Sequence, residues 1–278
     1  MNTLHKLFAL LSCLVAFSPF TLHAQLDDPL DIPWQQRDRK DTKPLPYEYV
    51  READVMWSKK VWRTIDLHQK MNLPFGYPQR PLIAILHDAA VHGEIRAYDP
   101  TVENADQFKE KMDTGRIARI GCSIDSQWII DPETLEEKLV VVRNPLTWDK
   151  ITKYRIKEVW FFDSKTSTMQ ARIIGIAPMM EDHAPDGTYR GDVAMYWLYY
   201  PDLREMLAKE EAFNIANDQR AMSWDDMFES RRFASYIYKE SNVYDRAIAE
   251  YATGLDARLE SDKIKQKTFE FEHDLWDY

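Results

Sequence analysis

RIKEVWFFDSKTSTMQARIIGIA, residues 155–177, contains two runs of β-branched and aromatic side chains with a polar stretch between them. The first run covers residues 155–162 and the second covers residues 169–177. Side chains of this kind suit the pleated surface of a sheet, and a short polar segment between two such runs is typical of a turn. The sequence therefore predicts a pair of antiparallel strands at this point.

Strand patterns extend to both sides of this pair. Within residues 116–125, Ile120, Cys122 and Ile124 share one face, which is typical of a half-buried strand. Residues 128–130 and 139–142 flank a turn-like Asp-Pro-Glu sequence and are expected to pair with each other. A further aromatic strand is expected over residues 193–200.

Two helices are predicted before these strands. Over residues 49–72 apolar side chains recur at a spacing of four, as on one face of an amphipathic helix. A second helix is expected to begin at Pro81 and end at Gly93, because proline suits the first turn and glycine the end of a helix. The side chains expected to face the core are Ala53, Trp57, Val61 and Ile65 in the first helix and Leu82, Ile85, Leu86 and Ala89 in the second.

Further helices are predicted near the C-terminal end. One begins at Pro201, and another begins at Ser223, where Asp226 three positions later favours a helix start. Residues 233–238 fit either a strand or a helix. A last long helix is expected over residues 244–259, mildly interrupted by a glycine. The side chains expected to face inward are Leu203, Met206 and Leu207 in the helix that follows Pro201, and Tyr244, Ile248, Tyr251, Leu255 and Leu259 in the last one.

Helices thus lie at both ends and strands lie between them, without regular alternation. This order predicts an α+β fold whose antiparallel sheet is flanked by helices at the N- and C-terminal ends. We expect a single folded domain over residues 47–278. Residues 25–46 hold four prolines among charged side chains, and this composition predicts an extended arm or linker.

The first 24 residues fit an export signal, with Lys6 before an apolar run over residues 7–17 and Ala24 at the end. We therefore expect the mature chain to act outside the cytoplasm. Residues 10–13, Leu-Leu-Ser-Cys, also fit a lipoprotein processing site, although the apolar run before them is very short. The chain has 36 basic and 46 acidic residues, and removing the leader with Lys6 gives a net charge of 35 − 46 = −11. Such an excess of acid argues against nucleic acid as the partner.

Short catalytic motifs are missing from the sequence: there is no Gly-x-Ser-x-Gly elbow, no phosphate-binding glycine loop and no Cys-x-x-Cys pair. The best candidate for a metal site is the group His87, Asp88, His92 and Glu94. However, two histidines share a helix face when they are four residues apart, and these are five apart. The alternative is a helix end at which His92 interacts with the helix dipole.

Other reactive side chains have structural explanations as well. Glu181, Asp182 and His183 precede a Pro-Asp-Gly sequence, and we interpret them as part of a turn rather than as a catalytic group. Cys122 could act as a nucleophile, but its place in the predicted strand over residues 116–125 favours a buried, inert thiol.

Tryptophan is abundant in the predicted helices and strands. Trp57, Trp160 and Trp197 could line a sugar-binding groove, but their spacing favours positions in the core.

Six long blocks of this sequence resemble one known family. They are YVREADVMWSKKVWRTIDLHQKMN (49–72), YRIKEVWFFD (154–163), ARIIGIAP (171–178), YWLYYPDLR (196–204), YKESNVYDR (238–246) and FEHDLWDY (271–278). In these blocks the chain resembles the GldN/PorN proteins of the type IX secretion and gliding machinery of Gram-negative bacteria. The resemblance spans virtually the whole predicted domain.

This resemblance implies a non-enzymatic, structural role. The chain would be a subunit of a ring in the periplasm, held at the outer membrane by a GldK/PorK-like lipoprotein. It would contact the GldM/PorM-like and GldL/PorL-like motor module and support protein export and, in gliding species, adhesin movement. The resemblance implies no cofactor, no metal and no catalytic residue.

The proline-rich arm matches this family least. Its main apolar side chains are Ile32 and Trp34, and we hypothesise that they bind a neighbouring protein. A plain spacer is the alternative for the arm. For the whole chain, the alternatives are an exported hydrolase with an unrecognised acidic or metal site, and a periplasmic ligand-binding module.

Overall fold

The computed structural model describes residues 42–102, 105–130, 137–144, 147–184, 186–214 and 222–274. All of them belong to one compact unit, Arg39–Tyr278. The predicted export signal, residues 1–24, lies outside the described residues, as do residues 25–41 of the arm with Ile32 and Trp34.

Short 3-10 helices, labelled η, alternate with the α-helices and strands. The elements are η1 (Glu52–Asp54), β1 (Val55–Asp66), η2 (Lys70–Gly76), α2 (Leu82–Val91), β2 (Ala97–Tyr98), η3 (Ala105–Gln107), α3 (Thr114–Ile117), β3 (Ser123–Ile130), β4 (Glu137–Asn144), η4 (Trp148–Lys150), β5 (Ile151–Asp163), β6 (Thr168–His183), β7 (Tyr189–Ala194), β8 (Trp197–Tyr199), α4 (Tyr200–Lys209), β9 (Glu211–Ala212), β10 (Met222–Ser223), α5 (Trp224–Glu229), β11 (Tyr236–Glu240), η5 (Ile248–Glu250) and α6 (Gly254–Asp274).

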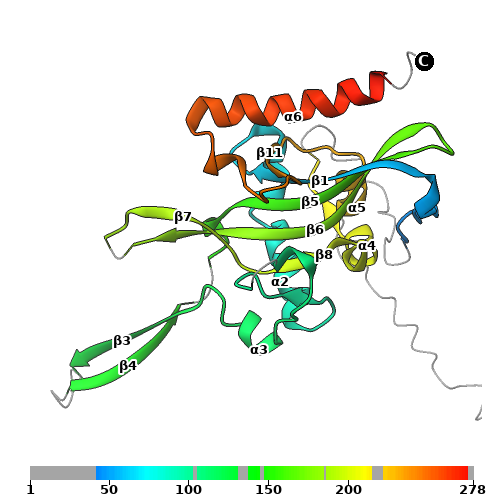
Figure 1. Ribbon diagram of the computed structural model, residues 1–278. Coiled ribbons are helices and arrows are strands. Elements are labelled where there is room, and N and C mark those ends of the chain that lie inside the picture. The colour runs from blue at the N-terminus through cyan, green and yellow to red at the C-terminus, as the bar shows by residue number, and fades with distance from the viewer. Residues whose placement is uncertain are drawn as a thin grey trace, which may run out of the picture. The chain divides into compact units, whose positions relative to one another are not determined.

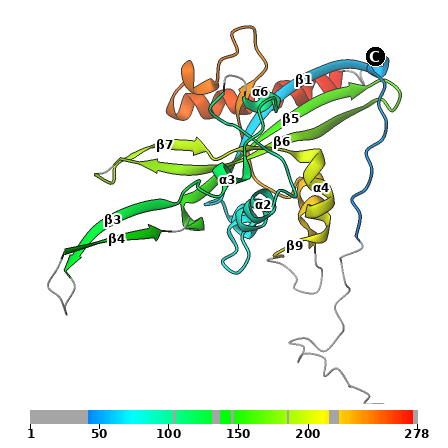
Figure 2. The same cartoon turned by 90° about the horizontal axis from the view of Figure 1, so that it is seen from below.

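A seven-stranded sheet forms the centre of the described structure (Figures 1 and 2). Its order is β11-β1-β5-β6-β8-β2, and β7 also pairs with β6. The predicted hairpin is confirmed as β5 and β6, with Trp160 opposite Ala171 and Phe162 opposite Met169. Every strand pair within the described ranges is antiparallel. The α+β class with an antiparallel sheet is therefore confirmed.

The helix predicted over residues 49–72 is wrong, because most of this segment is the long strand β1. A spacing of four residues places side chains on one face of a helix, but four is also an even number and places them on one face of a strand. Trp57, Val61 and Ile65 therefore keep a common face in β1, while Trp62 faces the other side. The β-branched and aromatic content of the segment favours the strand.

Two predicted strands have different limits in the structure. Within residues 116–125, a short helix, α3, comes first, and β3 begins only at Ser123. Residues 193–200 are divided between β7 and β8. These two strands pair with different parts of β6: β7 pairs with the C-terminal end of β6, and β8 pairs with Gly175 and Ile176. Between the two strands, Met195 and Tyr196 turn into the core.

The remaining predicted strand pair forms its own small sheet. β3 and β4 pair with each other in a two-stranded sheet, and Trp128 lies opposite Leu139, as expected. The predicted turn at residues 131–133 lies outside the described residues.

Within the described residues, three clusters of apolar side chains stabilise the unit. The largest joins β1, β5, β6 and β8 to α2, α4 and α5, with Ile65, Tyr154, Leu86 and Trp224 almost fully buried. A second cluster lies under α6 around Val61 and contains Ile237, Ile248 and Ile264. The third lies around Trp62 on the other face of β1 and contains Tyr98, Ala177 and Trp197. Burial of this apolar area is the main stabilising contribution.

Three helix starts agree with the sequence. α2 follows Pro81, and α4 has Pro201 in its first turn. At the start of α5, Ser223 and Asp226 form a complete capping box. Of the expected inward residues, Leu203 and Leu207 are fully buried, and Met206 packs partly buried against the main cluster. The ambiguous segment 233–238 leads into a strand, β11.

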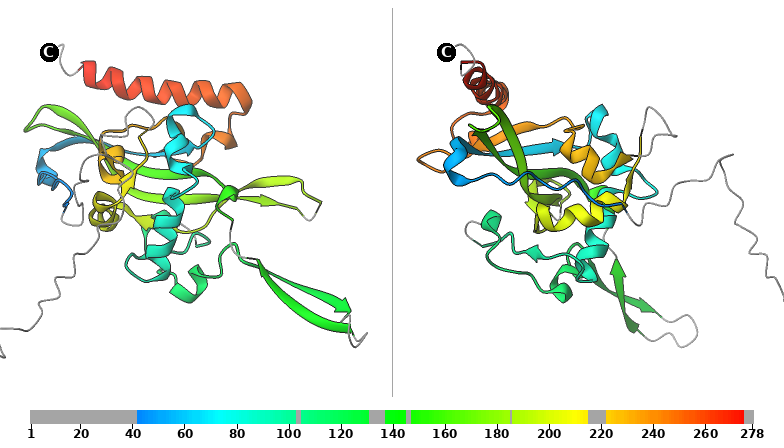
Figure 3. Two further views of the ribbon diagram at one scale, coloured as in Figure 1. Left: turned by 180° about the vertical axis from the view of Figure 1, so that it is seen from behind. Right: turned by 90° about the vertical axis from the view of Figure 1, so that its right-hand side faces the viewer.

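A last helix is present, but it covers Gly254–Asp274 and not residues 244–259. α6 begins at Gly254, which has a φ of 59°, and runs along β1 and β11 (Figure 3). Leu255 and Leu259, which were expected to face inward, are 73% and 50% exposed. The buried side chains Ser261 and Ile264 lie on the inner face instead. Near the other end of α6, Phe271 stacks on Trp57 of β1 with 4.8 Å between ring centroids.

Candidate functional site

The arm joins the folded unit through Tyr47. Residues 42–50 contain no helix or strand. The Tyr47 ring lies between two guanidinium groups, 4.1 Å from that of Arg204 and 4.8 Å from that of Arg172. Its hydroxyl donates a hydrogen bond of 2.6 Å to Glu229. Arg172 also donates to the backbone oxygen of Glu48 at 2.8 Å. Cation–π contacts and a charged acceptor together hold this part of the arm.

A buried ion pair supports the contact with Tyr47. Arg204 of α4 donates two hydrogen bonds to Asp225 of α5, at 3.0 and 3.1 Å, and both residues are buried. Tyr200 donates a third hydrogen bond to Asp225, at 3.1 Å. Two parallel N–H···O bonds fix the plane of a guanidinium group. The surface on which Tyr47 packs is therefore rigid, and we call Tyr47, Arg172, Arg204, Asp225 and Glu229 the arm anchor.

Electrostatics keep the tyrosines of this region protonated. Burial and the hydrogen bond to Glu229 raise the pKa of Tyr47 well above its usual value. Burial and the nearby Asp225 carboxylate raise the pKa of Tyr200 in the same direction. Both phenols therefore remain hydrogen-bond donors even at a pH at which an ordinary tyrosine ionises.

We expect Tyr47→Ala to release the arm without unfolding the domain. Losing the ring contacts and the hydrogen bond should cost about 1–2 kcal/mol of anchoring free energy. Limited trypsin digestion should then cleave after Arg51 faster, while the thermal midpoint changes little. The matched control is Tyr49→Ala, because Tyr49 is 86% exposed. Equal cleavage rates for both variants would contradict an anchoring role for Tyr47.

Sequence reasoning did not find the arm anchor. Its members come from four distant segments, and nothing in their local sequence indicates that they meet. Arg172 and Arg204 do lie in blocks that carry the family resemblance, but the resemblance gave them no role.

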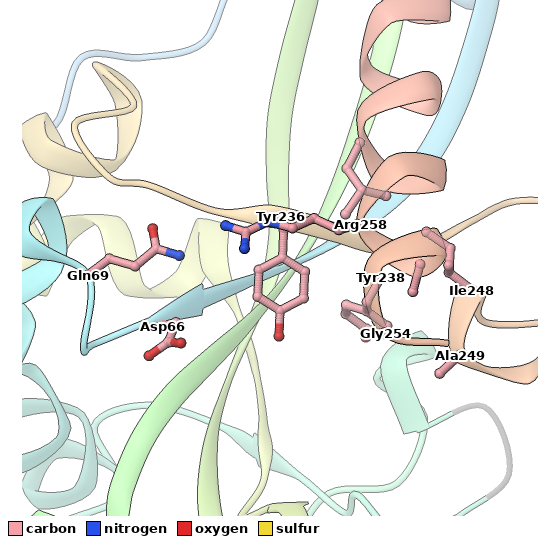
Figure 4. A pocket seen from close by; sticks show the side chains of 10 residues that line it. Asp66, Gln69, Tyr236, Tyr238, Ile248, Ala249, Gly254 and Arg258 are labelled. Carbon is pink, nitrogen blue, oxygen red and sulfur yellow. The ribbon is translucent and has the colours of Figure 1, made fainter. Parts of the chain in front are cut away.

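A second concave surface lies around β11, and we call it the β11 groove. One cavity of about 310 Å³ lies between β11, η5 and the first turns of α6, and its lining includes Ile237, Gln69 and Arg258 (Figure 4). A second cavity of about 330 Å³ has Lys153 and Arg155 in its lining. The two cavities share the lining residues Tyr236, Tyr238 and Ala249. Burial raises the pKa of Tyr238 to about 12.

The structure separates the side chains of the candidate metal site. His87 of α2 is buried, with Nδ1 3.4 Å from the Tyr196 hydroxyl and its ring against that of Trp148. His92 instead contacts the backbone oxygen of Asp88 through Nδ1, at 2.7 Å. Among the described residues, no group of three or more His, Cys, Asp or Glu side chains is placed to hold a metal ion. The arrangement agrees with the helix-end alternative for His92.

We expect His87 to make stability depend on pH. Burial lowers the pKa of His87, so the folded state binds a proton less readily than the unfolded state does. Its neutral form thus contributes stability that is fully present above pH about 6.5 and is lost as the pH falls towards the folded-state pKa. The difference in unfolding free energy between wild type and His87→Gln should therefore be largest at pH 7.5 and narrow towards pH 5. A difference in unfolding free energy that stays constant with pH would contradict this role of His87.

The other reactive side chains considered in the sequence lie in surroundings that differ from those predicted. Glu181, Asp182 and His183 lie on β6 and not in a turn, while Asp186 and Gly187 form the turn that follows. The expectation that Cys122 is buried is wrong: its side chain is exposed just before β3, with Sγ 3.5 Å from the Ala118 oxygen.

The tryptophans have different degrees of burial. Trp197 is buried as expected, whereas Trp57 and Trp160 are only partly buried, under or beside α6.

A comparison with protein families assigns the chain to one of them. The family described as "Gliding motility associated protein GldN" matches residues 50–277. The chain belongs to the GldN family. The resemblance recognised in the six sequence blocks is therefore confirmed, and it connects the chain with gliding motility and type IX secretion. No curated protein matches the chain.

The GldN match includes most of the arm anchor. Arg172, Arg204, Asp225 and Glu229 lie inside the matched range, and Tyr47 lies three residues before it. The β11 groove lies entirely within the match. In the described part of this GldN-family chain, no helix is long and apolar enough to span a membrane.

Proposed function

We propose that this GldN-family chain is a non-enzymatic structural subunit of a ring of the type IX secretion system. The ring would lie in the periplasm, attached to the outer membrane through a GldK/PorK-like lipoprotein, and would contact the GldM/PorM-like and GldL/PorL-like motor module. It would support protein export across the outer membrane and, in gliding species, movement on surfaces. The observation that carries the proposal is the family match over residues 50–277.

The geometry of the described residues suits such a role. Several large side chains are exposed in different parts of the fold, including Met56 of β1 at 70%, Tyr244 after β11 at 74% and Phe269 of α6 at 68%. Aromatic and methionine side chains are enriched at protein interfaces. A ring subunit needs two different complementary surfaces, and these side chains are available for both.

The subunit would consist of one folded domain, residues 47–278, and an arm, residues 25–46, that follows an export signal. We propose that Ile32 and Trp34 of the arm bind a neighbouring protein. In support, the arm anchor fixes the point at which the arm leaves the domain, so that a bound partner would be held at a defined place. Deletion of residues 25–46 should reduce co-purification with the lipoprotein, and Ile32→Ala with Trp34→Ala should have the same effect. Unchanged co-purification would favour the spacer alternative.

The proposed function is tested on the native assembly. Envelopes are extracted with detergent, the chain is captured by an affinity tag, and the product is analysed by mass spectrometry and electron microscopy. We expect ring-shaped particles that contain the lipoprotein. Capture of a lone monomer would contradict the proposal. Turnover of a defined compound by the purified chain, abolished by changing one acidic or imidazole side chain, would favour the hydrolase alternative.

A further inference from the structure

The β11 groove has unpaired positive charge next to aromatic rings. Its two carboxylates are already engaged: Asp66 contacts His68 at 2.8 Å, and Asp192 contacts Lys153 at 2.6 Å. Arg155 lies over the Tyr238 ring at 4.6 Å and, like Arg258, makes no ion pair within the described ranges. Two guanidinium groups thus remain available in a chain of net charge −10.

The shape of the groove suits an extended peptide with an aromatic or aliphatic anchor. Ile237, Ile248 and Ala257 provide an apolar surface in the first cavity. In Figure 4 the Arg258 side chain extends past Tyr236 in the direction of Gln69, along the rim of this cavity. A guanidinium group beside tyrosine rings favours a ligand that combines a carboxylate with an apolar side chain.

The chain itself contains such a segment. The residues that follow α6 are Leu275, Trp276, Asp277 and Tyr278, which combine apolar side chains with an acid. We call residues 275–278 the tail. The apolar side chains of the tail suit the apolar surface of the β11 groove. Its acid suits the two unpaired arginines, Arg155 and Arg258.

The tail cannot reach the groove of its own copy. The groove contacts α6 at Gly254 and Ala257, and the tail follows Asp274 at the other end of this 21-residue helix. At about 1.5 Å per residue, α6 separates the two points by about 30 Å. Trp276 is two residues beyond Asp274 and extends at most about 7 Å from it. The stacking of Phe271 on Trp57 holds that end of the helix against β1.

We propose that the β11 groove of one copy binds the tail of a second copy. The contact is head-to-tail, because each copy presents its groove to one neighbour and its tail to another. Such heterologous contacts produce a closed ring when the rotation between copies closes. The inference rests on the proposed function and deepens it by naming a contact between subunits.

Mixing two complementary variants tests this contact. The groove variant carries Arg155→Glu and Arg258→Glu, and the tail variant lacks residues 275–278. In analytical ultracentrifugation we expect wild type to self-associate as its concentration rises and each variant alone to remain monomeric. A mixture should form dimers of one copy of each variant, and these should not grow further, because the only intact groove and the only intact tail are then used. Circular dichroism and thermal midpoints check that both variants fold.

The charge-matched control carries Lys265→Glu and Lys267→Glu, two exposed cations on the same helix, and it should self-associate like wild type. Three results would each overturn the inference: a monomeric wild type at all concentrations, self-association of the tail variant equal to wild type, and a mixture that stays monomeric while wild type associates.

A peptide with the sequence FEFEHDLWDY, residues 269–278, gives a second measurement. It should bind the tail variant, whose groove is free, and the groove changes introduced into that variant should weaken binding by about tenfold or more. A scrambled peptide should not bind. Equal binding with and without the two arginines would contradict the inference.

Capture of the tail variant and of wild type from envelopes separates an error in the groove contact from an error in the proposed function. If the tail variant is still captured with the lipoprotein in rings like those of wild type, the groove contact is wrong and the proposed function stands. If wild type is captured alone from envelopes, the proposed function is wrong, while the mixing experiment still decides the groove contact.

Discussion

Replacing Glu158 with alanine is expected to lower the free energy of unfolding by about 3–5 kcal/mol, because Arg231 and the Trp160 indole lose a buried acceptor and the buried Arg63 loses a nearby negative charge. Glu158 of β5 is fully buried and accepts hydrogen bonds of 2.7 Å from Arg231 at both carboxylate oxygens. The Trp160 indole donates a further bond of 2.9 Å to the same carboxylate. Arg63 lies close by, and burial lowers its pKa while Glu158 raises it.

Chemical denaturation measures this effect. The control is Glu205→Ala, which removes an ion pair with Lys209 from a side chain that is 73% exposed. This change should alter stability by no more than about 0.5 kcal/mol. If Glu158→Ala costs no more than the control, the buried carboxylate does not hold β5 to the segment that carries Arg231.

Asp225→Ala is expected to have an effect of similar size, about 3–5 kcal/mol, and to release the arm as well. The substitution leaves the buried Arg204 without its bidentate partner and removes the acceptor of the Tyr200 hydroxyl. Because Arg204 then loses its fixed orientation, Tyr47 also loses one of its two cation–π contacts. The variant should therefore combine a lower unfolding free energy with faster trypsin cleavage after Arg51.

Comparison with Tyr47→Ala separates the two effects. Tyr47→Ala should increase cleavage of the arm without a large loss of stability, whereas Asp225→Ala should change both. The control for charge is Asp202→Ala, whose ion pair with Arg96 is largely exposed and should contribute less than about 1 kcal/mol. A stable Asp225→Ala variant with a protected arm would show that Arg204 finds another partner.

The sequence allowed the central hairpin, the start of α2 and the capping box at Ser223 to be predicted, because each depends on residues close together in the chain. The error at β1 has a definite cause. A repeat of four residues fits a helix face and a strand face equally, and only the pairing with β5 over residues 55–66 decides between them. That pairing is a long-range contact, which local periodicity does not contain.

The candidate sites could not be predicted for the same reason. Tyr47 meets Glu229 across 182 residues of sequence, and the β11 groove combines β1, β5, β11 and α6. Ile32 and Trp34 were selected from composition alone, and their role stays a prediction. The resemblance to the GldN family was the part of the functional reading that the sequence did support, because its blocks are long and occur in order.

The stacking of Phe271 on Trp57 has a consequence for any assembly of this chain. It holds one end of α6 against β1, while the other end of the helix lines the β11 groove. A continuous helix cannot stretch, so the two ends keep a constant separation of about 30 Å. If copies join through the tail and the groove, the length of α6 sets the repeat distance between them. An insertion of one helical turn in α6 would then alter the diameter of the particle rather than abolish its formation.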